Sequence, residues 1–350
     1  MSNVWRATKA AQYAASLIGI LMLASIGIGQ ISFLNFYLTR FAFEPGPWFS
    51  EHLAPALADS NHCLIVGLST AREGFDPAIL ERSVPGTKFL NGATTGGNIE
   101  VVEVQAQILA RYGVHPKCVI VGVHPFLMTA EFPPLLASTG YLAHLGFPDV
   151  FLLSNRWLPR REFQQVAEAM VLPLKLHSDR LNKLVRYGMF RLQERFRSEP
   201  LSINAYEYFK DEFTSGANAH YDDIHEAPER VAELTRARYD NYTSFTSRIP
   251  VQSFRRALAM MRKRTGTVFV VSMPNQKALA GLNARGQARY DEALGEADVV
   301  QVDCSGLVSD EHFIDDAHLD KEGRRILSSA IGKIVTGATS NSAKKLSCSE

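Results

Sequence analysis

Three apolar runs rich in β-branched residues constrain the fold of this chain more than any other feature. They are Cys63–Leu68 (CLIVGL), Cys118–Val123 (CVIVGV) and Thr267–Met273 (TVFVVSM). Their length and lack of polar alternation are typical of strands buried on both faces of a parallel sheet. Apolar residues at helical spacing in Glu100–Tyr112 place a helix between the first two runs. We therefore expect an α/β domain of three layers, a parallel sheet with helices on both faces.

Further segments extend this pattern toward the C-terminus. Lys88–Ala93 and Val299–Cys304 are expected as shorter strands, and Gln252–Lys263 and Lys321–Ile334 as helices. Residues 125–250 hold no comparable strand, but several helical stretches separated by prolines. We interpret this middle part as a helical insertion in the α/β domain.

The N-terminal segment 10–39 contains no Asp, Glu, Lys or Arg. About 20 apolar residues in a helix cross the hydrocarbon core of a bilayer, so this segment predicts a transmembrane helix. Arg6 and Lys9 precede it and acidic residues follow it, which places the N-terminus in the cytoplasm and the rest outside. A cleaved signal peptide is the alternative, but its apolar region would be shorter. Aromatic residues near the end of the segment favour a retained anchor.

These signals predict four parts. Residues 1–40 form a cytoplasmic stub and anchor, and 41–61 a proline-containing juxtamembrane linker. Residues 62–336 form the α/β domain, with its helical insertion at about 125–250. The Ser- and Lys-containing segment 337–350 is expected to be a disordered tail.

Charge and cysteine content exclude several classes of protein. The formal net charge of +1 gives no basis for a nucleic-acid partner, which requires a basic surface. The four cysteines match no zinc-ligand pattern and are too sparse for a disulfide framework. Cys63 and Cys118 each begin a strand, so the two thiols would be close if those strands were neighbours. We expect them to be buried free cysteines, because cysteine is commonly a small core residue.

A serine and a D-x-x-H sequence stand where a parallel sheet binds its ligands. Ser69 directly follows the first strand, and ligands of open parallel sheets lie beyond the carboxyl ends of the strands. A serine nucleophile needs an adjacent base, and a serine that only caps a helix is the alternative. Asp315 and His318 are three residues apart, immediately before the last helix, where the carboxylate can orient the imidazole. The conjunction predicts a Ser69–His318–Asp315 triad.

These residues also carry a family resemblance. GLS at 67–69, NGATTGG at 91–97 and DDAHLDKEG at 315–323 resemble the first, second and fifth sequence blocks of the SGNH (GDSL-like) hydrolase superfamily. The resemblance covers about 63–335 and is interrupted by the helical middle. It implies a flavodoxin-like sheet, with Ser69 as nucleophile and Asp315 and His318 as its catalytic partners.

The resemblance also implies an oxyanion hole. The backbone N–H groups of Ser69 and Gly96 would form it, with Gly97 as the alternative to Gly96. The third block of the family usually adds an asparagine, whereas the corresponding VIVGVHPFL has His124. Either His124 replaces that donor or the site works differently, and a polar residue that merely ends a strand is the alternative.

Two further residues near the site are candidates for substrate contact. They are Arg72, three residues after Ser69, and Asn98, directly after the second block. Arg72 would contact an anionic substrate or pair with a nearby acid.

The divergent third block is similar to that of membrane-anchored proteins of polysaccharide O-acetylation and teichoic-acid D-alanylation. The resemblance implies an O-acyltransferase or acylesterase, with transfer favoured over hydrolysis. The protein would be single-pass in a bacterial inner membrane, with its catalytic domain on the periplasmic side. Its partners would be a polysaccharide acceptor, the bilayer through residues 10–39, and a polytopic membrane-bound O-acyltransferase. The alternative is a non-catalytic assembly or glycan-binding subunit.

No cofactor or metal is expected. GATTGG at 92–97 lacks both the G-x-G-x-x-G pattern and the Walker lysine. HYDDIH at 220–225 has ligand-type residues, but no second cluster accompanies it, and we interpret it as an exposed polar loop.

Overall fold

The computed structural model divides into two compact units. One comprises Met1–Pro47 and Leu136–Phe213, and the other Trp48–Leu135 and Thr214–Glu350. The residues that the structure describes are 59–94, 98–129, 147–154, 225–242, 247–295, 297–337 and 345–348, with isolated positions 13, 16, 19, 20, 56 and 145. Of the first unit they include helix α7 (Phe147–Ser154); the sheet belongs to the second.

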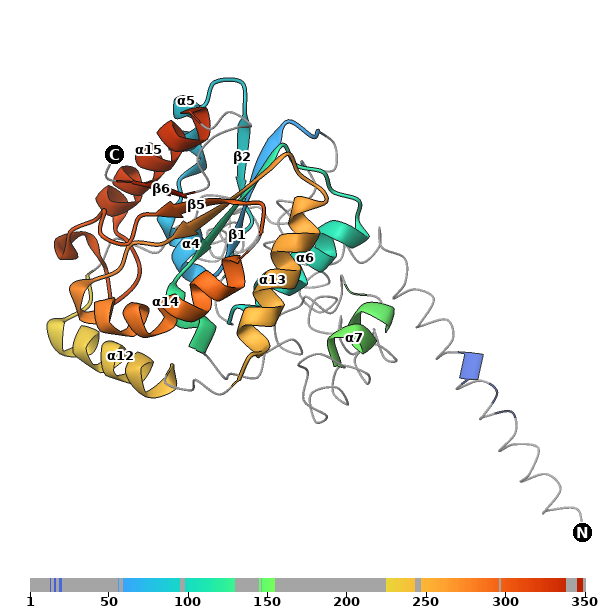
Figure 1. Ribbon diagram of the computed structural model, residues 1–350, viewed down its shortest axis with the longest axis horizontal. Coiled ribbons are helices and arrows are strands. Elements are labelled where there is room, and N and C mark those ends of the chain that lie inside the picture. The colour runs from blue at the N-terminus through green and yellow to red at the C-terminus, as the bar shows by residue number, and fades with distance from the viewer. Residues whose placement is uncertain are drawn as a thin grey trace, which may run out of the picture. The chain divides into compact units, whose positions relative to one another are not determined.

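The second unit is built on a parallel sheet of six strands (Figure 1). The strands are β1 (His62–Gly67), β2 (Lys88–Asn91), β3 (Cys118–Val123), β4 (Thr267–Ser272), β5 (Val300–Asp303) and β6 (Lys345–Ser347), in the order β2-β1-β3-β4-β5-β6. The chain passes from β1 outward to β2 and then returns to β3 on the other side of β1. The carboxyl ends of β1 and β3 therefore flank a topological switch point, where open α/β sheets bind ligands.

Two groups of helices cover opposite faces of the sheet (Figure 1). One group is α4 (Ser69–Gly74), α5 (Pro77–Ser83) and α15 (Lys321–Gly337). The other is α6 (Glu100–Arg111), α13 (Ile249–Arg262) and α14 (Ala280–Leu294). Every residue of β1 and β3 is buried, because both faces are covered. The predicted α/β class with a parallel sheet is confirmed.

The expectation of free cysteines is wrong. Parallel pairing of β1 with β3 sets Cys63 opposite Cys118, with their Cα atoms 4.5 Å apart, and the two form a disulfide. Residues in register on neighbouring strands point to the same face, so both sulfur atoms lie in the core beneath α4 and α5. A second disulfide joins Cys304, after β5, to Cys348, after β6.

The C-terminal segment also departs from expectation. Helix α15 extends to Gly337, and Lys345–Ser347 pairs with β5 as an edge strand. A disordered tail is therefore wrong for residues 345–348, which β5 and the second disulfide hold. Helix α14 was not predicted, because its sequence (AGLNARGQARYDEAL) contains two glycines and few large apolar residues.

Several predicted parts lie outside the described residues. They include almost all of the apolar segment 10–39, most of the linker, and most of the predicted insertion at 125–250. Within that insertion the structure shows η1 (Pro125–Thr129), α7 and α12 (Pro228–Asn241). Among the described residues, no helix combines the length and apolar character that a membrane span requires.

Candidate active site

Ser69 is the first residue of α4, two positions beyond the end of β1. Gly67 makes this turn with φ +142°, and a Cβ there would lie 2.5 Å from the carbonyl oxygen of Gly122 and 2.8 Å from the Cβ of Ala71. Only glycine leaves α4 this close to β1 and β3. The half-buried Ser69 thus stands at a helix start, where backbone N–H groups lack intrahelical acceptors.

Two buried amide side chains fix the backbone around the serine. Gln105 on α6 donates from Nε2 to the carbonyl oxygen of Gly67 (3.1 Å) and accepts from the N–H of Gly67 through Oε1 (3.2 Å). Asn91, at the end of β2, donates from Nδ2 to the carbonyl oxygens of Arg72 (2.9 Å) and Phe75 (3.1 Å). Gln105 therefore holds the strand end before Ser69, and Asn91 holds the helix after it.

The structure brings the three predicted triad residues together. His318 Nε2 lies 2.8 Å from Ser69 Oγ, and His318 Nδ1 lies 2.6 Å from Asp315 Oδ2. An ionised carboxylate only accepts hydrogen bonds, so Nδ1 carries the proton and Nε2 is left to accept one from the serine hydroxyl. The side chains of His318 and Asp315 are only 13% and 17% exposed, which shields these bonds from water.

Asp315 is held in its ionised form. Burial raises the pKa of Asp315. The opposing effects are larger and bring the pKa down to about 2: they are the hydrogen bond and charge of His318 and the N–H groups of Ala317 and His318. Those N–H groups donate to Oδ1 at 2.8 and 2.7 Å, which leaves Oδ2 for the imidazole. Asp315 is therefore a fixed negative charge that can stabilise an imidazolium at His318.

The loop that carries Asp315 and His318 is held at several points. Phe313 and Leu319 form an isolated antiparallel bridge, so the loop closes on itself. Gln276, after β4, donates from Nε2 to the carbonyl oxygen of Asp315 (2.9 Å).

An ion pair holds the same loop from a second direction. Arg238 on α12 pairs through two nitrogen atoms with Asp316, whose side chain is fully buried. Neither Arg238 nor Gln276 was predicted from the sequence. The doubled aspartate at 315–316 was the one visible signal for this pair, because Arg238 lies in the predicted insertion and belongs to no motif.

His124 follows β3 at the switch point and is 1% exposed. Its ring stacks on Phe126 with centroids 5.0 Å apart, and neither ring nitrogen has a hydrogen-bond partner in the described part of the chain. Burial, then the charges of Arg238 and His318, lowers the pKa of His124 to about 3, so the ring is neutral. A neutral imidazole still offers one N–H donor.

The other predicted site residues are either held by contacts within the protein, buried, or outside the described residues. Arg72 Nε lies 3.4 Å from Glu73 Oε1, so it pairs with a nearby acid; its contact with a substrate stays a prediction. Asn98 is buried at the entrance to α6, and its role toward a substrate also stays a prediction. Gly96 and Gly97 lie outside the described residues, as do His220, Asp222 and Asp223 of the HYDDIH segment.

Glu100, the first residue of α6, is a buried acid that belongs to none of the predicted motifs. It is 3% exposed, and its Oε2 has no hydrogen-bond partner among the described residues. Burial is the largest influence and raises its pKa to about 8; nearby Glu103 adds to this, while its own N–H and Arg256 oppose it.

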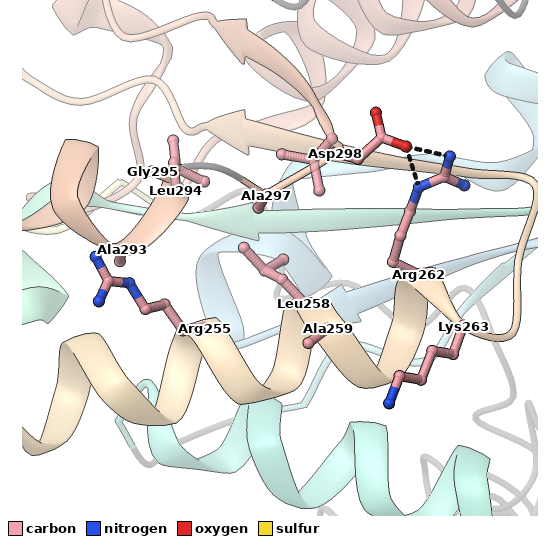
Figure 2. Close-up of a pocket in the computed structure, with 11 residues that line it drawn as sticks. Arg255, Leu258, Ala259, Arg262, Lys263, Ala293, Leu294, Gly295, Ala297 and Asp298 are labelled. Atoms are coloured by element: carbon pink, nitrogen blue, oxygen red, sulfur yellow. Dashed lines mark hydrogen bonds and ion pairs between the residues drawn. The ribbon is translucent and has the colours of Figure 1, made fainter.

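The two largest hollows lined by described residues of the second unit lie at opposite ends of the strands. A crevice of about 840 Å³ opens at the carboxyl ends of β4 and β5, on the same edge of the sheet as Ser69. A pocket of about 650 Å³ lies between the last turns of α13 and α14, where β5 begins, with Arg262 paired to Asp298 at its rim (Figure 2). It is at the opposite end of the strands from Ser69.

Neither a comparison with models of known protein families nor a search of curated proteins finds a match for this chain. The site therefore has to be interpreted from its own geometry. A serine hydroxyl, an imidazole oriented by an ionised carboxylate, and a nearby neutral histidine form an arrangement that can activate an oxygen nucleophile.

Proposed function

We propose that this protein is an extracytoplasmic O-acyltransferase or acylesterase that modifies a cell-surface or exported polysaccharide. The observation that carries the proposal is the hydrogen-bonded series Ser69–His318–Asp315, with distances of 2.8 and 2.6 Å. Two residues brought together from positions 249 apart in sequence, at the switch point of a parallel sheet, favour a catalytic over a structural role.

The chemistry follows from the protonation states. Ser69 Oγ attacks the acyl carbonyl carbon while His318 Nε2 takes the hydroxyl proton, and Asp315 stabilises the resulting imidazolium. The carbon–oxygen bond to the donor then breaks, and the departing oxygen takes the proton from Nε2. A sugar hydroxyl or water attacks the acyl-serine by the same route in reverse and restores Ser69.

The tetrahedral oxyanion needs at least two donors. The N–H of Ser69, at the start of α4, is one, and Gly96 is the second expected from the family resemblance. His124 is the third: its neutral ring can donate one hydrogen bond where the resembling proteins have asparagine. Removing one oxyanion donor costs about 10²–10³ in kcat, so His124→Ala should slow the reaction by that factor.

Further features support the proposed location outside the cytoplasm and the proposed acyl transfer. Two disulfides are typical of proteins outside the cytoplasm, because cytosolic thiols are kept reduced. The strand order resembles the flavodoxin-like sheet of SGNH hydrolases, and the apolar segment 10–39 would hold the domain at an inner membrane. Such an anchor favours transfer over hydrolysis, because it keeps the domain beside a membrane-bound O-acyltransferase able to deliver acyl groups.

A fluorophosphonate probe tests the proposal directly. The probe should label the wild-type protein at Ser69, and labelling should be lost in Ser69→Ala and fall strongly in His318→Ala. Equal labelling of wild type and His318→Ala would show that His318 does not activate Ser69 and would refute the proposed mechanism. Mass spectrometry of an oligosaccharide incubated with p-nitrophenyl acetate then separates transfer, which yields acetylated sugar, from hydrolysis.

The second candidate function is a non-catalytic assembly or glycan-binding subunit of a membrane-bound acyltransferase complex. The observation that favours it is His124 in place of the asparagine donor, beside a stacked Phe126. A stable complex with a polytopic membrane acyltransferase, without labelling of Ser69, would support this alternative.

A further inference from the structure

The crevice at the carboxyl ends of β4 and β5 adjoins the triad through the chain itself. Its wall includes Pro125, which follows His124, and Asn275, which precedes Gln276. The Gln276 side chain holds the carbonyl oxygen of Asp315 at 2.9 Å. The crevice therefore lies beside the triad, at the same carboxyl edge of the sheet as Ser69.

The lining is composed of groups that suit hydroxyl ligands. Side-chain amides and hydroxyls, which donate and accept hydrogen bonds, come from Asn275, Asn283, Gln287, Ser305 and Ser309. One lysine (Lys277) and one aspartate (Asp310) give the lining no net charge. Such a surface fits a neutral polyhydroxylated molecule better than an anion or an acyl chain.

Part of this lining is already fixed before any ligand arrives. Asn283 accepts from the N–H of Phe126 (3.3 Å) and donates to Asn275 Oδ1 (2.6 Å). Asn275 in turn donates to the carbonyl oxygen of Gln276 (3.0 Å). Groups that are held in place lose little conformational freedom when a ligand binds.

The distance between Ser69 and the crevice restricts the length of the ligand. In the sheet order, β4 is two strands from β1 and β5 is three. With a strand spacing of about 4.8 Å, the crevice lies about 10–14 Å from the nucleophile. A small ester bound at Ser69 cannot reach it, whereas an extended sugar chain can occupy both places.

We propose that this crevice binds the sugars that flank the acylated residue, so that the substrate is a neutral oligosaccharide segment of a polymer. The inference rests on the proposed function for the position of the reacting sugar. The lining itself supports a binding site for sugars whether or not Ser69 is reactive.

A matched pair of tryptophan variants tests the crevice. Ala284 is an exposed alanine of α14 that lines the crevice, and Ala259 is an exposed alanine of α13 that lines the other pocket (Figure 2). Calorimetric titration of the full-length protein would use β-1,4-linked tetrasaccharides of glucose and N-acetylglucosamine and the corresponding monosaccharides. In wild type and Ala259→Trp, a tetrasaccharide should bind at least about ten-fold more tightly than its monosaccharide. Ala284→Trp should remove that advantage.

Two results would overturn the inference. One is equal affinity of wild type for tetrasaccharide and monosaccharide, and the other is the same affinities in both tryptophan variants. Fluorophosphonate labelling separates this failure from failure of the proposed function. If Ser69 is labelled but the tetrasaccharide binds no more tightly than the monosaccharide, the proposal of a sugar-binding crevice is wrong and the proposed enzymatic function stands. If the tetrasaccharide binds more tightly, this advantage is lost in Ala284→Trp, and Ser69 is not labelled, the sugar-binding crevice stands and the proposed enzymatic function is wrong.

Discussion

Glu100→Gln should make the protein more stable at neutral pH, although it replaces an acid at a helix N-terminus. The pKa of Glu100 is about 8 in the folded protein, against an ordinary value of 4.5 for a glutamate side chain. The folded state therefore binds more protons than the unfolded state between these values, and stability falls as pH rises through this range. Below pH 4.5 both states are protonated and the cost disappears.

The magnitude follows from the two pKa values. One pH unit corresponds to about 1.36 kcal/mol, so at pH 7 the acid lowers the free energy of unfolding by about 3 kcal/mol. Glutamine has nearly the same shape and does not ionise. We expect a gain of about 3 kcal/mol at pH 7 and less than about 1 kcal/mol at pH 5.

Urea unfolding at pH 5, 6, 7 and 8 measures this gain. Glu103→Gln is the matched control, because Glu103 lies one turn away on α6 and is equally buried, but accepts from Arg256 and Ser253. Breaking that buried pair should destabilise the protein by about 3–5 kcal/mol. A Glu100→Gln variant that is no more stable at pH 7, or whose gain is constant from pH 5 to pH 8, would refute the reasoning.

Three further variants test the site. Asp315→Asn should lower kcat for p-nitrophenyl acetate by about 10⁴ at every pH from 5 to 8, because the imidazole loses its orienting charge; a loss below ten-fold would mean that Asp315 does not orient the base. Gly67→Ala should destabilise the protein by at least about 2 kcal/mol in urea, since its Cβ would meet Gly122 at 2.5 Å; wild-type stability would contradict the close approach. Arg238→Ala should cost about 3–5 kcal/mol, because Asp316 would stay buried and unpaired, and should slow fluorophosphonate labelling; unchanged unfolding and labelling would show that this ion pair does not support the loop.

The sequence was sufficient for the features that depend on local pattern. The buried runs before Ser69 and His124 have the length and composition of central strands, and the structure has both in one parallel sheet. Asp315 and His318 were predictable as a pair because their contact spans only three residues. Their meeting with Ser69 followed from placing each segment at the carboxyl edge of the same sheet.

The remaining features depend on register and long-range packing, which one sequence does not encode locally. Cys63 and Cys118 are bonded because β1 and β3 are neighbours in a particular register. The support of Asp316 by Arg238 depends on where α12 lies against the loop that carries Asp315 and His318. No short pattern predicts either contact.

The disulfide between β1 and β3 has a consequence for the order of assembly. It closes a loop of 55 residues that contains Ser69, Asn91 and Gln105, and a loop of that length restricts the unfolded chain by about 4 kcal/mol. These three residues are thus tied together by residue 118, whereas the imidazole that contacts Ser69 Oγ belongs to residue 318. During synthesis the first half can close before His318 reaches it, while Ser69 is still an ordinary alcohol. On the proposed function, Ser69 becomes reactive only when the C-terminal loop docks and brings His318 to its hydroxyl.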